Sequence, residues 1–243
     1  MYIRKIYRFR NAIEIEEHAT GLFGAPGLRR KKKKEPTPEQ VQARNQRLKT
    51  TRCRRKLRAH FVKNDYMVTL TYKKEQRPAD MQEAKADLTR FLRRLRKFYA
   101  AKGRRLKWIA NIEVGTKGAW HAHMVINRAP DADVAIREAW QHGRVSFQLL
   151  HEHGEYRDLA AYMTKTPLTD KRLKEACYKC ARGLEIPEPE EIRHRGRFAP
   201  LDQVGPPPGW YVDPESLVEG ENLVTGTPFR QFTLLRTDRG GDK

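Results

Sequence analysis

Residues 120–126 have the sequence WHAHMVI, and this stretch decides how the whole chain is interpreted. Trp, Ala, Met and Ile occupy the even positions, whereas His121 and His123 occupy odd ones. Successive side chains of a β-strand point to opposite faces, so the pattern predicts a strand with an apolar face and an imidazole-bearing face. The two imidazoles would lie about 7 Å apart along the strand, which suits two ligands of one metal ion.

The segments around this strand predict the rest of the domain. Three further segments alternate in the same way, namely residues 66–72, 108–114 and 144–149. Apolar residues at helical spacing predict three helices, over residues 80–99, 131–141 and 155–165. The resulting order of strands and helices is that of a split βαβ, or ferredoxin-like, arrangement. We therefore expect an α+β fold, an antiparallel sheet with helices on one face and an open, mainly polar catalytic face.

A metal site is expected on that open face. Glu113 lies on the strand before the histidine strand, and a five-residue loop over 115–119 would place it opposite His121. A four-residue loop over 115–118 would pair it with Trp120 on the wrong face, and the alternation of side chains favours the first register. Two histidines and a carboxylate with open positions suit a catalytic divalent ion, Mg²⁺ or Mn²⁺.

The predicted helix over 155–165 offers a nucleophile. Tyr162 and Lys165 are three residues apart, so they share one face of the helix. A tyrosine hydroxyl has a pKa near 10, and a nearby ammonium group and metal ion would favour the phenolate. A core tyrosine with its hydroxyl at the surface is the alternative interpretation. Tyr156 lies about 240° away around the helix, so we expect a single catalytic tyrosine.

The charge of the chain points to a polyanionic partner. Its 243 residues include 50 Lys and Arg against 30 Asp and Glu, a formal net charge of +20. Nucleic acid is the simplest partner for such a chain. No stretch approaches 18 consecutive apolar residues, so we expect no transmembrane helix. Three cysteines are too few for a disulfide scaffold and fit a reducing cytosol.

Charge also divides the chain into three expected parts. Residues 1–62 form a basic N-terminal arm and a helix from about Pro38 to His60, residues 63–176 the catalytic domain, and residues 177–243 a Pro-rich, acidic C-terminal extension. A late strand over 231–235 is possible, but the sequence does not place it.

Several residues are expected to contact DNA. The arm contains six consecutive cations, which either bind phosphates or remain a solvated tail. The expected DNA contacts are Arg29, Arg30, Lys31, Lys32, Lys33 and Lys34 in the arm, and Thr69, Thr71 and Arg144 in the catalytic domain.

The two motifs together resemble a known family. His121-Ala122-His123 on a strand, followed about forty residues later by Tyr162-x-x-Lys165 on a helix, is similar to the HUH endonucleases. The likeness is closest to the rolling-circle replication initiators of phages and plasmids.

Two further segments extend the resemblance. Residues 68–72 (VTLTY) resemble the first motif of that family, and residues 140–143 (WQHG) resemble its phage versions. The likeness covers about residues 55–170.

The resemblance implies a cut-and-rejoin mechanism. Tyr162 would attack a phosphodiester of single-stranded origin DNA and leave a 5′-phosphotyrosine and a free 3′-hydroxyl. A metal ion on His121, His123 and Glu113 would polarise the phosphate, and Lys165 would help to position it or neutralise its charge. The 3′-hydroxyl would prime a host polymerase in the bacterial cytoplasm, and a second transfer would close the circle. Because the chain lacks a phosphate-loop motif, a host helicase is expected to unwind the duplex.

Other functions stay open at this stage. A mobilisation relaxase or a single-strand transposase would use the same chemistry. A non-catalytic nucleic-acid-binding sheet would stack bases on aromatic side chains, in which the predicted open face is poor.

Overall fold

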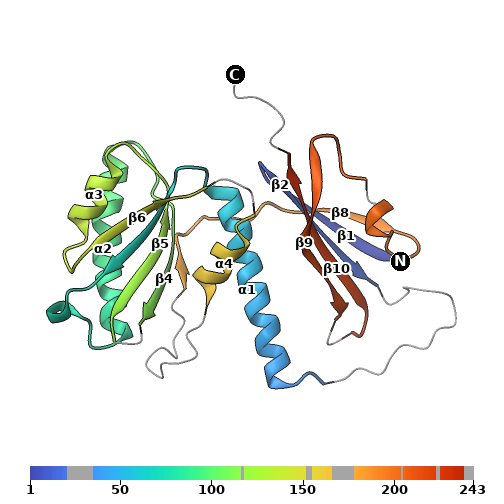
Figure 1. Ribbon diagram of the computed structural model, residues 1–243, viewed down its shortest axis with the longest axis horizontal. Coiled ribbons are helices and arrows are strands. Elements are labelled where there is room, and N and C mark those ends of the chain that lie inside the picture. The colour runs from blue at the N-terminus through green and yellow to red at the C-terminus, as the bar shows by residue number, and fades with distance from the viewer. Residues whose placement is uncertain are drawn as a thin grey trace. The chain divides into compact units, whose positions relative to one another are not determined.

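The computed structural model describes residues 1–20, 35–115, 118–151, 155–165, 178–203, 205–222 and 225–237. The chain forms two compact units (Figure 1). The central unit comprises Lys49–Glu152 and Tyr156–Glu185, and the terminal unit comprises Met1–Leu48, His153–Glu155 and Ile186–Lys243. None of the described helices combines the length and the apolar composition that a membrane span requires.

The central unit is built on an antiparallel sheet. Its strands are β3 (Tyr66–Thr71), β4 (Trp108–Val114), β5 (Trp120–Ile126), β6 (Val145–Leu149) and β7 (Lys179–Cys180). They lie in the order β6-β3-β5-β4-β7, and every neighbouring pair is antiparallel. The four strands predicted from alternation are confirmed to within one residue at each end, whereas the short edge strand β7 was not predicted.

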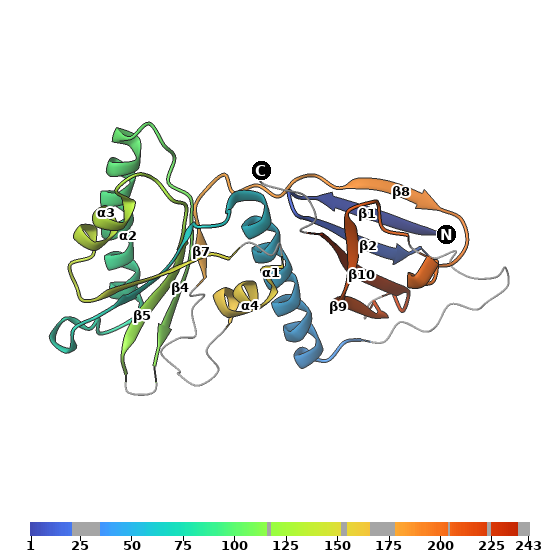
Figure 2. The same ribbon diagram turned by 45° about the horizontal axis from the view of Figure 1, so that its top comes forward.

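Two helices cover one face of this sheet, α2 (Met81–Ala101) and α3 (Ala132–Ala139) (Figure 2). The even-numbered strand residues pack beneath them with Leu88, Phe91 and Leu95 of α2. Asp80 caps α2, because its carboxylate accepts a 2.8 Å hydrogen bond from the Glu83 amide. The α+β class and both helices are therefore as predicted.

Two more helices pack on the opposite face of the sheet, and this corrects the prediction of helices on one face only. They are α4 (Arg157–Thr164) and the second half of α1 (Pro38–His60) (Figures 1 and 2). Leu57 and Met163 are buried there with Ile109 and Val125 of the sheet. Ile109 and Val125 occupy polar-face positions but are apolar, so this half of the face requires a cover. The half that carries Thr71, Glu113 and His121 is left more exposed.

The terminal unit contains a second antiparallel sheet. Its strands are β1 (Tyr2–Arg8), β2 (Ala12–Ala19), β8 (Glu190–His194), β9 (Trp210–Glu221) and β10 (Pro228–Arg236), in the order β8-β1-β2-β10-β9.

This sheet changes the expected division of the chain. The expected arm begins with two strands, and they pair with strands of the expected extension. The helix expected from Pro38 to His60 is α1 and has those bounds. Two short 3-10 helices complete the described elements, η1 (Lys74–Gln76) and η3 (Leu201–Gln203).

Candidate active site

The register of three strands brings the predicted site residues onto one face. β4 places Glu113 opposite His121 and Asn111 opposite His123, while β3 places Thr69 opposite His123. The Gly115 amide donates a 2.8 Å hydrogen bond to the Ala119 carbonyl, which closes the hairpin as the five-residue loop requires. The predicted register is therefore confirmed.

His123 lies at the centre of this group and is almost fully buried. Its Nε2 atom is 3.5 Å from Oε2 of Glu113, and its Nδ1 atom is 3.1 Å from Oγ1 of Thr69. Both ring nitrogens thus have polar neighbours that fix the orientation of the imidazole. Thr69, which the sequence suggested as a DNA contact, supports a histidine here.

The Glu113 carboxylate is half-buried and ionised. Hydrogen bonding to His123 lowers the pKa of Glu113, and the charges of Lys165 and His121 also lower it, while burial acts in the opposite direction. Lys165, which follows α4, therefore lies near enough to act on the carboxylate, as its predicted role requires.

His121 is half-buried on the same face. Burial lowers the pKa of His121, and the neighbouring His123 lowers it further, so the neutral imidazole that a metal requires is favoured. Gly115 leaves room for this ring, because a Cβ atom at that position would lie 3.1 Å from Nε2 of His121.

Tyr162 on α4 reaches the same group. The centroids of its ring and the His123 ring are 4.9 Å apart, and the ring planes meet at 68°. Its side chain is 37% exposed, so solvent or a substrate has access to it. Burial raises the pKa of Tyr162 to about 12, and the Glu113 carboxylate adds to the rise. The hydroxyl is therefore protonated in this state.

Helix α1 holds α4 in place. Oγ1 of Thr164 donates to the Ala160 carbonyl at 2.7 Å and lies 2.8 Å from Oγ1 of Thr50. Nζ of Lys49 donates to the Thr164 carbonyl at 3.2 Å. No sequence pattern signals this contact, because the two partners lie more than 100 residues apart. It positions the helix that carries Tyr162.

Asn111 is a polar residue that lacks partners. It is fully buried opposite His123, and neither atom of its amide group has a hydrogen-bond partner among the described residues. An unsatisfied buried amide is costly, so this position points to a polar group or water beside the histidine.

The segment over residues 140–143 fixes the end of β3. Nε1 of Trp140 donates a 2.9 Å hydrogen bond to the carbonyl of Thr71. A Cβ atom on Gly143 would overlap that same oxygen, so only glycine fits. Oγ1 of Thr71 also donates to the carbonyl of Arg144 at 3.1 Å. Thr71 and Arg144 thus lie together at this end of the sheet, and their contact with DNA stays a prediction. The six cations Arg29–Lys34 lie outside the described residues.

Metal binding would need a change in the side chains. Across the described part of the chain, no three His, Cys, Asp or Glu side chains are close enough together to hold an ion as they stand. The ring centroids of His121 and His123 are 6.0 Å apart. Directly opposed residues have Cβ atoms about 4.5–5.5 Å apart, so rotation of side chains alone could bring the three donors onto one ion. Two imidazoles and an ionised carboxylate on one face fit a divalent cation.

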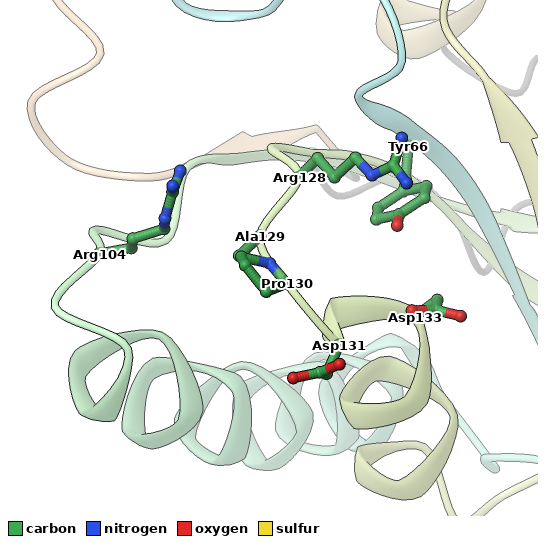
Figure 3. Close-up of a pocket in the computed structure, with 7 residues that line it drawn as sticks. All are labelled: Tyr66, Arg104, Arg128, Ala129, Pro130, Asp131 and Asp133. Atoms are coloured by element: carbon green, nitrogen blue, oxygen red, sulfur yellow. The ribbon is translucent and has the colours of Figure 1, made fainter.

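A pocket elsewhere in the central unit is separate from this group (Figure 3). It is lined by Tyr66, where β3 begins, and by Arg128, which follows β5. The candidate site lies where β3 ends and β5 begins, at the opposite end of the sheet.

The comparison with protein families follows from this geometry. Residues 65–167 match the family model of the ORF2-type replication-associated proteins. The match supports a replication initiator of the Rep type, a role in DNA replication and an interaction with DNA. It includes the whole His, Glu and Tyr group as well as Trp140–Gly143, whereas the strands of the terminal unit lie outside it. Neither a curated protein nor a solved structure matches the chain significantly.

Proposed function

We propose that the protein is a rolling-circle replication initiator that nicks and rejoins single-stranded DNA at an origin. The observation that carries the proposal is the position of the Tyr162 ring beside the imidazole of His123, although the two lie on segments far apart in the sequence. The match to the replication-associated family supports the biological role.

The proposed reaction is an exchange of one phosphodiester for another. Oη of Tyr162 bonds to the phosphorus atom, the bond to the 3′ oxygen breaks, and a 5′-phosphotyrosine forms. The phenol loses a proton as the leaving oxygen gains one, so the protons balance. The reverse exchange, with a new 3′-hydroxyl as the attacking group, rejoins the strand.

His121, His123 and Glu113 would hold the ion, Mg²⁺ or Mn²⁺. Such an ion, when bound, polarises a phosphoryl oxygen and stabilises the charge that develops on it. Glu113 raises the pKa of Tyr162, and neutralising its charge would ease the loss of the phenolic proton. Lys165 would place a second positive charge near the phosphate.

The fold supports the same proposal. Without the edge strand β7, the sheet order β6-β3-β5-β4 with helices after β3 and β5 is the order expected of a ferredoxin-like split βαβ unit. We propose the HUH endonuclease arrangement for this unit. Tyr156, the nearest other tyrosine, has a buried hydroxyl, which supports a single-tyrosine enzyme.

The partners follow from this role. Thr71, Arg144 and the cations Arg29–Lys34 would contact origin DNA, and a host polymerase and helicase in the bacterial cytoplasm would extend and unwind it. A relaxase or transposase would use the same residues, and the family match favours the initiator.

Covalent capture of DNA tests the nucleophile. Wild-type protein is incubated with Mn²⁺ and single-stranded DNA of mixed sequence, and adducts that survive detergent are counted. We expect an adduct with wild type and with the control Tyr156→Phe, but none with Tyr162→Phe. An adduct with Tyr162→Phe would disprove the assignment of the nucleophile.

Calorimetric titration with Mn²⁺ alone tests the metal site without relying on activity. Wild type should bind one ion, and His121→Ala should weaken the binding at least tenfold while affinity for single-stranded DNA is largely kept. Equal binding of Mn²⁺ by both proteins would remove His121 from the metal site.

A further inference from the structure

A second DNA-binding surface is suggested by the charge on α2. Between Leu88 and Ile112 the chain has nine basic residues and no acidic one. Most of them are fully exposed and only Lys107 is half-buried. The nine residues are Arg90, Arg93, Arg94, Arg96, Lys97, Lys102, Arg104, Arg105 and Lys107.

The geometry of the helix concentrates five of these cations on one surface. Arg90, Arg93, Arg94 and Lys97 are spaced i, i+3, i+4 and i+7, so they form one stripe along about 10 Å of helix. Arg96 lies beside the stripe, and the buried residues of α2 face the opposite way. We call these five residues the α2 basic face.

Part of this charge is not neutralised by the protein. Arg90 pairs with Asp87, and Arg94 donates a hydrogen bond to the carbonyl of Ala139. Within the described residues, Arg93, Arg96 and Lys97 make no ion pair. Three exposed cations at helical spacing without carboxylate partners are available to an anionic ligand.

The character of the surface indicates which polyanion it suits. Proteins that bind single strands combine cations with aromatic side chains on which bases stack. The large aromatic side chains of this layer, Phe91, Tyr99 and Trp140, are buried in the core. A surface with charge but no exposed aromatic ring suits a duplex, whose bases are internal and whose phosphates face outward.

The position of the surface separates it from the candidate active site. α2 packs on one face of the central sheet, while Tyr162 on α4 and the two histidines lie on the other (Figure 2). A strand bound at the site would therefore leave the α2 basic face free.

We propose that the α2 basic face binds the phosphate backbone of duplex DNA, while the opposite face cleaves the single strand. This inference rests on the proposed function, because it assigns to the initiator a separate grip on the duplex beside the nicked strand.

Neutralising the free cations tests the inference. In the full chain, Arg93, Arg96 and Lys97 are all changed to Gln (R93Q/R96Q/K97Q). The matched control changes three exposed arginines of the terminal unit (R193Q/R195Q/R197Q), with the same loss of charge. Binding of a 30-base-pair duplex of mixed sequence (about 30, chosen to cover several helical turns) is followed by fluorescence anisotropy at several salt concentrations.

We expect the α2 variant to lose at least tenfold in duplex affinity at moderate salt. Its slope of log affinity against log salt should fall by about 2–3, since each lost phosphate contact removes about 0.9. The control should keep most of its affinity, and unchanged melting curves would show that both variants fold. Adduct formation on single-stranded DNA should stay at the wild-type level in the α2 variant.

Three results would overturn the inference. They are an unchanged salt slope in the α2 variant, an equal loss in the control, and a loss confined to single-stranded DNA, which would make the surface a single-strand site. A failure of the proposed function would look different, because wild type would then form no adduct although its duplex binding could still be measured.

Discussion

Two glutamates, one in each sheet, are surrounded in opposite ways. Glu17 of β2 is completely buried, and its carboxylate lies 2.7 Å from Arg4 and 2.5 Å from Arg230. Glu113 of β4 is partly exposed, and its ion-pair neighbour is His123 at 3.5 Å. The charge of Glu17 is matched inside the protein and serves the fold, whereas that of Glu113 is left partly available to a ligand. A carboxylate therefore signals a functional site through its incomplete pairing rather than through its burial.

Glu17→Ala should have the largest effect on stability. Removal of one partner leaves two arginines without their carboxylate, one of them buried, which costs about 3–5 kcal/mol. Hydrogen exchange of β2 and β10 in the full chain measures the loss, and the strands of the central unit report any general effect. As a control, Glu191→Ala removes the exposed pair with Lys5 and should cost about 0–1 kcal/mol. Equal effects of the two variants would contradict the structural role of Glu17.

Gly143→Ala asks whether the sheet end that carries Glu113 is rigid. The added methyl group would overlap the Thr71 carbonyl, and such overpacking costs about 1–3 kcal/mol. Urea unfolding followed by fluorescence of the central-unit tryptophans measures it. Gly205→Ala is the matched control, because a Cβ atom there meets nothing within 4 Å. A neutral Gly143→Ala would mean that this end of the sheet is loose.

Thr50→Val tests how firmly α4 is held. The variant loses the contact with Thr164, and an ordinary hydrogen bond contributes about 0.5–1.5 kcal/mol. We expect a drop of that size in stability and slower adduct formation, with unchanged affinity for single-stranded DNA. Wild-type adduct kinetics would show that α1 does not position Tyr162.

Glu113→Gln should have the smallest effect on stability and thereby sharpen the comparison with Glu17. The group has few partners to orphan, so the expected change is about 0.5 kcal/mol or less. Adduct formation with Mn²⁺ should nevertheless be lost. A variant that unfolds as readily as Glu17→Ala would place both glutamates in the same structural class.

The elements of the central unit could be predicted because the sequence signals there are local. Alternation in residues 108–114 and 120–126 indicated both strands, their faces and the register of Glu113 against His121. The reach of α1 to α4 could not be predicted, because hydroxyl contacts between distant segments leave no periodic pattern. Ile109 and Val125 were a visible sign of the second helical layer, since they interrupt the polar face with apolar side chains.

The terminal sheet was not predicted for a different reason. β1 carries charged residues at neighbouring positions, such as Arg4 and Lys5, so its alternation is weak. Its partners β2 and β8 bury it only after the chain ends have met, and no local pattern encodes that meeting. The side-chain orientation of His121 and the unsatisfied amide of Asn111 likewise depend on packing that the sequence does not display.

The position of the central unit in the sequence, between the two parts of the terminal unit, has a consequence for synthesis on the ribosome. β2 emerges early, but its partner β10 lies about 210 residues downstream, since His18 pairs with Phe229. At typical translation rates the hairpin of β1 and β2 waits about 10–40 s for that partner, with Ile13 and Ile15 uncovered. The central unit is translated in full during that interval. Nascent chains stalled before β10 should therefore carry a protease-resistant core over residues 49–185 and a protease-sensitive N-terminus.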